Sequence, residues 1–99
     1  MAAYFVVDIQ EITDQQMYTD YSKQVKPTLE QYGGTFVVRG GAYETIEGGW
    51  QPQRFVILEF ADTEQFKRWY NSPEYSKIRP LRFAASTARA IVVQGAEPV

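Results

Sequence analysis

The sequence predicts an α+β domain in which helices alternate with the strands of one sheet. Four segments rich in β-branched and aromatic residues are separated by segments with helical spacing and helix-capping residues, in the order β-α-β-β-α-β. Period-2 alternation also divides the strand residues into one wholly apolar face and one mixed face. This order is typical of the ferredoxin-like sandwich, with an antiparallel sheet ordered 4-1-3-2 and the helices on one face.

The first half of the chain supplies two strands and one helix. Ala3–Ile9 is almost continuously apolar and predicts a buried strand. Thr13 is placed to cap a helix that ends before Gly33, and Pro27 inside it is expected to kink or break the helix. Thr35–Arg39 predicts the second strand.

The second strand and the third are predicted to form a long hairpin. Gly40 and Gly41 indicate a bulge or a close backbone approach, after which Tyr43–Ile46 continues the strand. Arg54–Phe60 is the third strand.

Two further helices and a strand complete the order. Asp62 and Gln65 form a capping-box pattern, and Ser72–Pro73 predicts a separate helix start. Pro80 is expected to end or bend that helix near Arg79. Ala88–Gln94 predicts the last strand.

Composition narrows the classes of function. The chain has 99 residues, and we expect a single domain over 1–99. It has no cysteine and no histidine, which excludes disulfides, zinc–thiolate sites, a Ser–His nucleophile and a His-ligated haem, so no metal and no cofactor is predicted. The longest apolar run, residues 1–7, has seven residues, whereas a membrane span needs about 20. These features predict a soluble, cytoplasmic protein without a membrane segment.

The charge is unevenly distributed. Residues 67–89 hold six of the ten basic residues and one acid, although the net charge is -2. This basic segment is either a solvated helix face or a contact for an anionic ligand or an acidic partner. Binders of nucleic acid are usually basic overall, so no nucleic-acid partner is predicted.

The mixed face of the predicted sheet is too apolar to meet water bare. We therefore expect a homodimer through the sheet face, because symmetric pairing buries the same patch on both subunits. The apolar face, predicted to lie under the helices, carries Phe5, Val7, Ile9, Phe36, Val38, Val56, Leu58, Phe60, Ala90 and Val92. The mixed face carries Tyr4, Val6, Asp8, Val37, Arg39, Phe55, Ile57, Glu59, Arg89, Ile91 and Val93.

Four charges on the mixed face are expected near one end of the sheet. A hairpin centred near Gly49 places Arg39 opposite Glu59, and Asp8 lies beside Arg89. In a polar pocket, Asp8 or Glu59 could act as a catalytic acid or base while Arg39 binds a ligand. Alternatively, the four groups are cross-strand ion pairs at the rim of a dimer interface.

A second group of candidates surrounds Ser72. In the functional interpretation, Asn71, Tyr75 and Arg79 form a polar lip that binds a substrate carboxylate, and Tyr70 is a further candidate for ligand binding. In the structural interpretation, Ser72 caps a helix and Tyr75 is a core aromatic.

An ordered set of short segments resembles the domain of unknown function family 1330 over nearly the whole chain. The segments are Pro27–Leu29, Tyr32–Gly34, Arg39–Gly41, Glu47–Gly48, Trp50, Asn71–Tyr75 and Arg79–Arg82. The resemblance implies a dimeric α+β barrel. Proteins of that wider superfamily include cofactor-free monooxygenases, muconolactone-type isomerases and haem-degrading enzymes, whose histidine ligand has no counterpart here.

Three classes of function follow. The first is an enzyme or binder of a small anionic or carbonyl-bearing molecule, with its pocket between the helices and the sheet. The second is a non-catalytic structural or interaction homodimer. The third is an RNA-binding sheet, but Arg54–Phe60 lacks the glycine-rich third-strand signature of that class.

Overall fold

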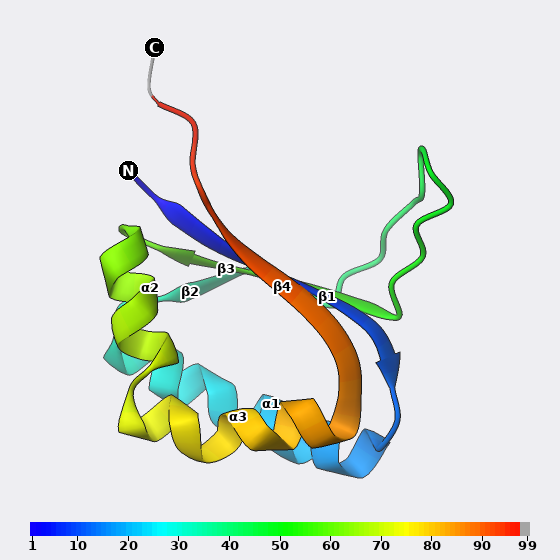
Figure 1. Ribbon diagram of the computed structural model, residues 1–99, viewed down its shortest axis with the longest axis horizontal. Helices are drawn as coiled ribbons and strands as arrows, with labels where there is room; N and C mark the ends of the chain where they lie inside the picture. The colour runs from blue at the N-terminus through cyan, green and yellow to red at the C-terminus, as the bar shows by residue number, and fades with distance from the viewer. Residues whose placement is uncertain (98–99) are drawn as a thin grey trace.

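A computed structural model describes residues 1–97 and confirms the predicted ferredoxin-like arrangement. Its elements are β1 (Ala3–Ile12), α1 (Gln15–Gln31), β2 (Thr35–Arg39), β3 (Arg54–Phe60), α2 (Thr63–Tyr70), α3 (Pro73–Ala85) and β4 (Ser86–Gln94). The sheet is antiparallel with the order β2-β3-β1-β4, which is the predicted order read from the other edge. Figure 1 shows all three helices on one side of this sheet.

Polar side chains fix where each helix begins. The cap of α1 is Asp14, which accepts a hydrogen bond from the backbone N–H of Met17 at 3.0 Å, so the prediction of Thr13 was wrong by one residue. The backbone N–H of Thr13 instead donates to the carbonyl of Ala85 at 2.7 Å and ties β1 to the end of α3. Asp62 and Ser72 cap α2 and α3 as predicted.

The two internal prolines do not end their helices. Both α1 and α3 continue as helix through Pro27 and Pro80, so a break at Pro27 and an end near Arg79 are wrong, whereas the alternative of a bend at each proline stays a prediction. Both prolines lie on the exposed side of their helices. Water can therefore hydrogen-bond to the carbonyls that lose a backbone partner, and packing of the opposite face maintains the helix.

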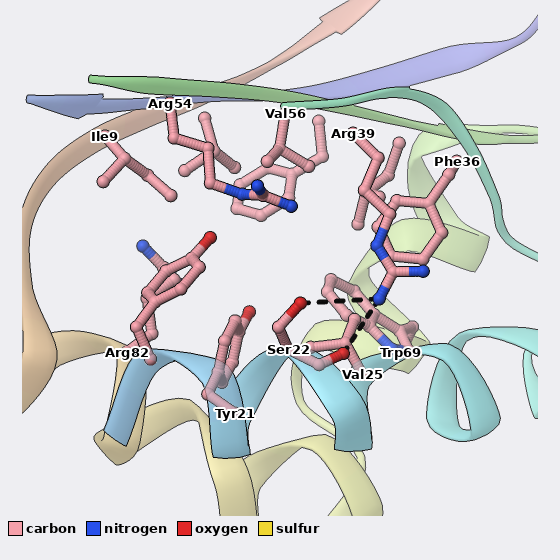
Figure 2. Close-up of a pocket in the computed structure, with 14 residues that line it drawn as sticks. Ile9, Tyr21, Ser22, Val25, Phe36, Arg39, Arg54, Val56, Trp69 and Arg82 are labelled. Atoms are coloured by element: carbon pink, nitrogen blue, oxygen red, sulfur yellow. Dashed lines mark hydrogen bonds between the residues drawn. The ribbon is translucent and has the colours of Figure 1, made fainter. Parts of the chain in front are cut away.

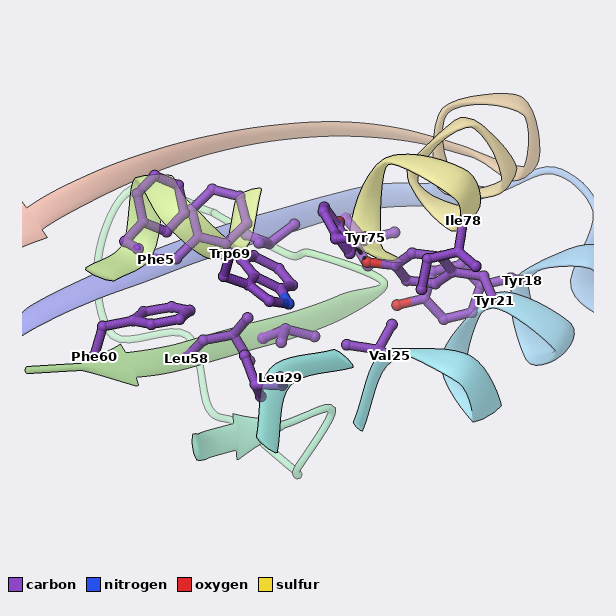
Figure 3. Close-up of a cluster of buried hydrophobic side chains, with 14 of the residues drawn as sticks. Phe5, Tyr18, Tyr21, Val25, Leu29, Leu58, Phe60, Trp69, Tyr75 and Ile78 are labelled. Carbon is purple, nitrogen blue, oxygen red and sulfur yellow. Dashed lines mark hydrogen bonds between the residues drawn. The ribbon is translucent and has the colours of Figure 1, made fainter. Parts of the chain in front are cut away.

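The core lies between the helices and the helix-facing side of the sheet (Figure 3). Its centre is Trp69 of α2, which is fully buried. The Trp69 ring stacks on Tyr75 of α3 with centroids 4.0 Å apart and lies 5.5 Å from Phe60 of β3. The indole N–H also donates to the hydroxyl of Thr28 in α1 at 3.0 Å. One side chain thus joins three helices and the sheet.

A long loop of residues 40–53 separates β2 from β3 and projects from the sheet (Figure 1). The predicted strand continuation at Tyr43–Ile46 is wrong, because these residues bond within the loop instead of pairing with β3. The Tyr43 hydroxyl donates to the carbonyl of Pro52, and the Thr45 hydroxyl donates to the carbonyl of Trp50.

A β-bulge in β2 changes the faces of the residues that follow it. The register shifts between Phe36 and Val38, earlier than the bulge predicted at Gly40 or Gly41. Val38 pairs with Ile57 on the outer face, and Arg39 pairs with Val56 on the helix-facing side. The predicted faces of Val38 and Arg39 are therefore both wrong, because one extra residue reverses the alternation.

No helix within residues 1–97 is both long and apolar enough to cross a lipid bilayer.

Candidate functional site

A cavity lies between α1, α3 and the helix-facing side of the sheet (Figure 2). It is so narrow that only a few water-sized molecules fit inside it. Its polar lining consists of Tyr18, Tyr21, Ser22, Arg39, Arg54 and Arg82. Its apolar lining consists of Phe5, Val7, Ile9, Val25, Phe36, Val56, Leu58 and Trp69.

Three guanidinium groups from separate elements line this cavity. Arg82 extends from α3 and is only 5% exposed, and Arg54 stands half-buried at the start of β3 with its guanidinium 5.6 Å from the centre of the Tyr18 ring. The Nε atoms of Arg54 and Arg82 are buried and have no hydrogen-bond partner among the described residues. A buried N–H group without an acceptor is costly, so both atoms are suited to an acceptor from a ligand.

Arg39 occupies the solvent-exposed end of the cavity. Its Nη2 donates to the backbone carbonyl of Ser22 in α1 at 2.9 Å, with the Ser22 hydroxyl 3.5 Å away, and its guanidinium lies 4.2 Å from the centre of the Phe36 ring. These partners are uncharged. The Arg39 side chain thus bridges β2 and α1, and no carboxylate of residues 1–97 forms an ion pair with it.

The tyrosines of the cavity are neutral at physiological pH. Burial raises the pKa of Tyr18, and the nearby Arg54 offsets only part of this rise. Burial, together with the adjacent Tyr75 hydroxyl, raises the pKa of Tyr21 well above its ordinary value. The hydroxyls of Tyr21 and Tyr75 share a hydrogen bond of 2.8 Å. These phenols therefore supply hydrogen bonds and no negative charge.

Arg82 retains its charge despite its burial. Burial alone would lower the pKa of this guanidinium, but the neighbouring Tyr75 and Tyr21 outweigh that effect and the pKa is raised. Across residues 1–97, the cavity lining contains no aspartate or glutamate. The cavity is therefore strongly positive and contains no carboxylate of its own.

The predicted acid–base candidates, Asp8 and Glu59, lie on the outer face of the sheet, away from this cavity. Asp8 is buried beside Arg89, whose Nε donates to its Oδ2 at 2.8 Å, and the indole N–H of Trp50 donates to the same oxygen at 3.2 Å. Glu59 pairs with Tyr4, four residues or about 13 Å along β1 from Asp8.

The predicted cluster of four charges is therefore wrong. The β2 bulge turns Arg39 to the other face and brings Thr35, in place of Arg39, opposite Glu59. The expected neighbours Asp8 and Arg89 do pair, and form an ion pair. The sheet thus separates Asp8 and Arg89 from the Arg39 guanidinium.

The residues of the predicted polar lip gather at the α2–α3 junction without lining the cavity. Nη1 of Arg79 donates to the carbonyl of Tyr70 at 2.9 Å, and its guanidinium lies 4.5 Å from the centre of the Tyr70 ring. Asn71 ends α2, and its backbone N–H donates to the carbonyl of Lys67. Tyr75 is fully buried and does not line the cavity, although it contacts two residues that do, through its hydrogen bond to Tyr21 and its stacking on Trp69. Their contacts connect the two helices.

The sequence analysis missed five of the polar lining residues: Tyr18, Tyr21, Ser22, Arg54 and Arg82. Two of them carry a signal. Arg54 has the same parity as Val56 and Leu58, so alternation places it on the helix-facing side. Arg82 follows Tyr75 and Ile78 at helical spacing, which places a cation on the buried stripe of α3. For both arginines, the signal in the sequence was thus a charged residue on an otherwise apolar face.

Within the described range 1–97, no group of three or more His, Cys, Asp or Glu side chains is arranged to hold a metal ion.

Solved structures with similar folds are distant in sequence. A protein of unknown function from Rhodopseudomonas palustris has a TM-score of 0.79 at 18% identity, covering 98% of this chain and 84% of its own. SnoaB, a cofactor-independent oxygenase from Streptomyces nogalater, has a TM-score of 0.67 at 13% identity, covering 99% and 96%. A putative antibiotic biosynthesis monooxygenase from Nitrosomonas europaea has a TM-score of 0.63 at 11% identity, covering 98% and 100%. These likenesses show the fold alone.

No match was found among curated proteins. The model of one protein family does match the sequence, over residues 2–96, and its description is "Domain of unknown function (DUF1330)". The match includes every segment on which the resemblance in the sequence rested. This chain therefore belongs to the DUF1330 family.

Proposed function

We propose that this chain binds a small anionic molecule in the cavity between its helices and its sheet. One observation carries the proposal: the cavity is lined by three guanidinium groups and, within residues 1–97, by no carboxylate. Two buried Nε atoms there lack acceptors, which an anion would supply. The planar guanidinium group is well matched to a carboxylate.

The lining supports binding better than acid–base catalysis. Asp8 and Glu59 lie on the other side of the sheet, and the raised pKa values of Tyr18 and Tyr21 keep these phenols protonated. A protonated phenol donates a hydrogen bond and can polarise a carbonyl group, but it does not remove a proton. The cavity is thus suited to hold an anion or a carbonyl oxygen.

Arg39→Met is expected to weaken the binding of an anion that contacts Arg39 at least about tenfold, because a charge-assisted hydrogen bond contributes about 1.5–3 kcal/mol. The measurement is a thermal-shift screen of carboxylates on the wild type, followed by calorimetric titration of each hit. Arg68→Met is the matched control, because Arg68 is an exposed arginine of α2 outside the cavity. The folded state should survive both changes, since Arg39 is exposed.

Equal affinity in the Arg39→Met and Arg68→Met variants would show that Arg39 does not contribute to binding. A screen in which no carboxylate stabilises the wild type would overturn the proposed function and favour the alternative, a non-catalytic homodimer.

We also propose that a second copy of the chain covers the outer face of the sheet. Three large apolar side chains there are well exposed: Val37 at 50%, Ile91 at 64% and Val93 at 46%. The half-buried Phe55 and Ile57 extend this apolar surface across β3. A two-fold axis through the face would bury the same residues on both copies.

Ile91→Lys is therefore expected to convert the dimer to monomer, because it places a charge in the proposed interface. Sedimentation equilibrium at micromolar concentration is the measurement, with Phe83→Lys as the control. Phe83 is 59% exposed, but it lies on α3, in the helical layer. A wild-type mass near 11.4 kDa would contradict the proposal, and so would an Ile91→Lys variant that remains a dimer.

A further inference from the structure

The three guanidinium groups of the cavity follow one another along its length. Figure 2 shows Arg82 and Arg39 toward opposite ends, with Arg54 between them. The strand register agrees with this arrangement: Arg39 is paired with Val56, two residues or about 7 Å along β3 from Arg54. The cavity therefore has positive charge at both ends.

The inner end has two hydrogen-bond donors without acceptors. Arg82 is 95% buried by the surrounding protein, being only 5% exposed, and its Nε has no partner within residues 1–97. The Nε of Arg54 is also buried and has no hydrogen-bond partner among these residues. One carboxylate has two oxygens with several lone pairs, so a single group could accept from both.

The outer end holds a cation that can be released. Arg39 is exposed, and within residues 1–97 its side-chain hydrogen bonds go only to the carbonyl and hydroxyl of Ser22. A ligand carboxylate would be a stronger partner for the guanidinium than these neutral oxygens. Because the cavity is narrow, movement of Arg39 away from Ser22 would also open the space that a ligand needs.

The part of the cavity between Arg54 and Arg39 is apolar. Val25 of α1, with Val56 and Leu58 of β3, lines it from both layers, and the indole of Trp69 closes one side. These side chains offer no partner to a third charged group. They do favour a hydrocarbon segment, since apolar contact in a site shielded from water is stabilising.

We propose that the ligand is a small dicarboxylate, with one carboxylate at Arg54 and Arg82, the other at Arg39, and a hydrocarbon segment between them. This inference rests on the proposed function and makes it more specific. Two negative charges also match the cavity better than one, because its three cations face no acidic side chain among residues 1–97 and its phenols are neutral.

The test compares acids that differ only in their second carboxylate. Succinate, glutarate and adipate are titrated into the wild-type protein at one salt concentration, alongside butyrate, pentanoate and hexanoate. We expect the best dicarboxylate to bind at least about tenfold more tightly than the monocarboxylate of equal carbon number. In Arg39→Met this ratio should fall to about one while monocarboxylate affinity is unchanged. In Arg68→Met the ratio should stay at the wild-type value.

The outcomes distinguish the dicarboxylate inference from the proposed anion binding on which it rests. If the two series bind equally well to the wild type, the dicarboxylate inference is overturned and anion binding stands. The inference also fails if the preference persists in Arg39→Met, or if inorganic phosphate binds more tightly than every dicarboxylate. If no acid of either series binds, the proposed function itself fails.

Discussion

Replacing Trp69 with alanine is expected to lower the free energy of unfolding by about 3–5 kcal/mol, the usual cost of truncating a buried large aromatic side chain. Trp69 is fully buried and contacts aromatic rings of β1, β3 and α3. The change also leaves the Thr28 hydroxyl without the indole N–H that donates to it. Urea denaturation monitored by circular dichroism measures the loss.

The second tryptophan supplies the control for this prediction. Trp50 is 50% exposed and makes one side-chain hydrogen bond, to Asp8, so Trp50→Ala should cost about 1 kcal/mol. Trp69→Phe separates packing from hydrogen bonding, because it keeps an aromatic ring but removes the N–H group. Similar losses for Trp69→Ala and Trp50→Ala would show that Trp69 is not the centre of the core.

Gly34→Ala is expected to destabilise the fold by about 1–3 kcal/mol through overpacking. A Cβ atom at Gly34 would lie 2.5 Å from Cδ1 of Leu29 and 2.7 Å from Cε1 of Phe60. Both neighbours are only 1% exposed, so neither has free space into which it can move. The contact also sets how closely the end of α1 approaches β3. Thermal unfolding of the variant measures the cost.

Gly41→Ala is the matched control. A Cβ atom at Gly41 would have no atom within 4 Å, and its backbone is outside the left-handed region. We therefore expect this variant to unfold within about 0.5 kcal/mol of the wild type. An equal loss for Gly34→Ala and Gly41→Ala would mean that close packing at Gly34 does not limit the fold.

Trp69 connects the stability of the core to the candidate site, because it packs within the core cluster and also lines the cavity. The Tyr21–Tyr75 hydrogen bond makes a second such connection between α1 and α3. The charged side chains of the cavity thus extend from well-packed elements. Arg39, on the short strand β2 and exposed to solvent, is the exception, which is consistent with its proposed release on binding.

Local patterns determined most of the architecture. The strand order followed from the arrangement of apolar segments, and Asp62 and Ser72 were recognised as helix caps because they act on backbone groups only a few residues away. The Asp8–Arg89 pairing was also predicted correctly, since both residues lie in a regular part of β1 and β4. Such features depend on residues that are close in sequence, or on strand side chains that alternate between the two faces without a bulge.

The candidate site was decided by the tertiary structure. One extra residue in β2 turned Arg39 from the outer face to the cavity, and alternation counts positions without detecting a bulge. Parity and helical spacing carried an unused signal that Arg54 and Arg82 face inward, but only the packing of α3 under the sheet brings them into one cavity. The sequence therefore determined which residues face inward in regular elements, whereas contacts between distant segments decided which of them meet.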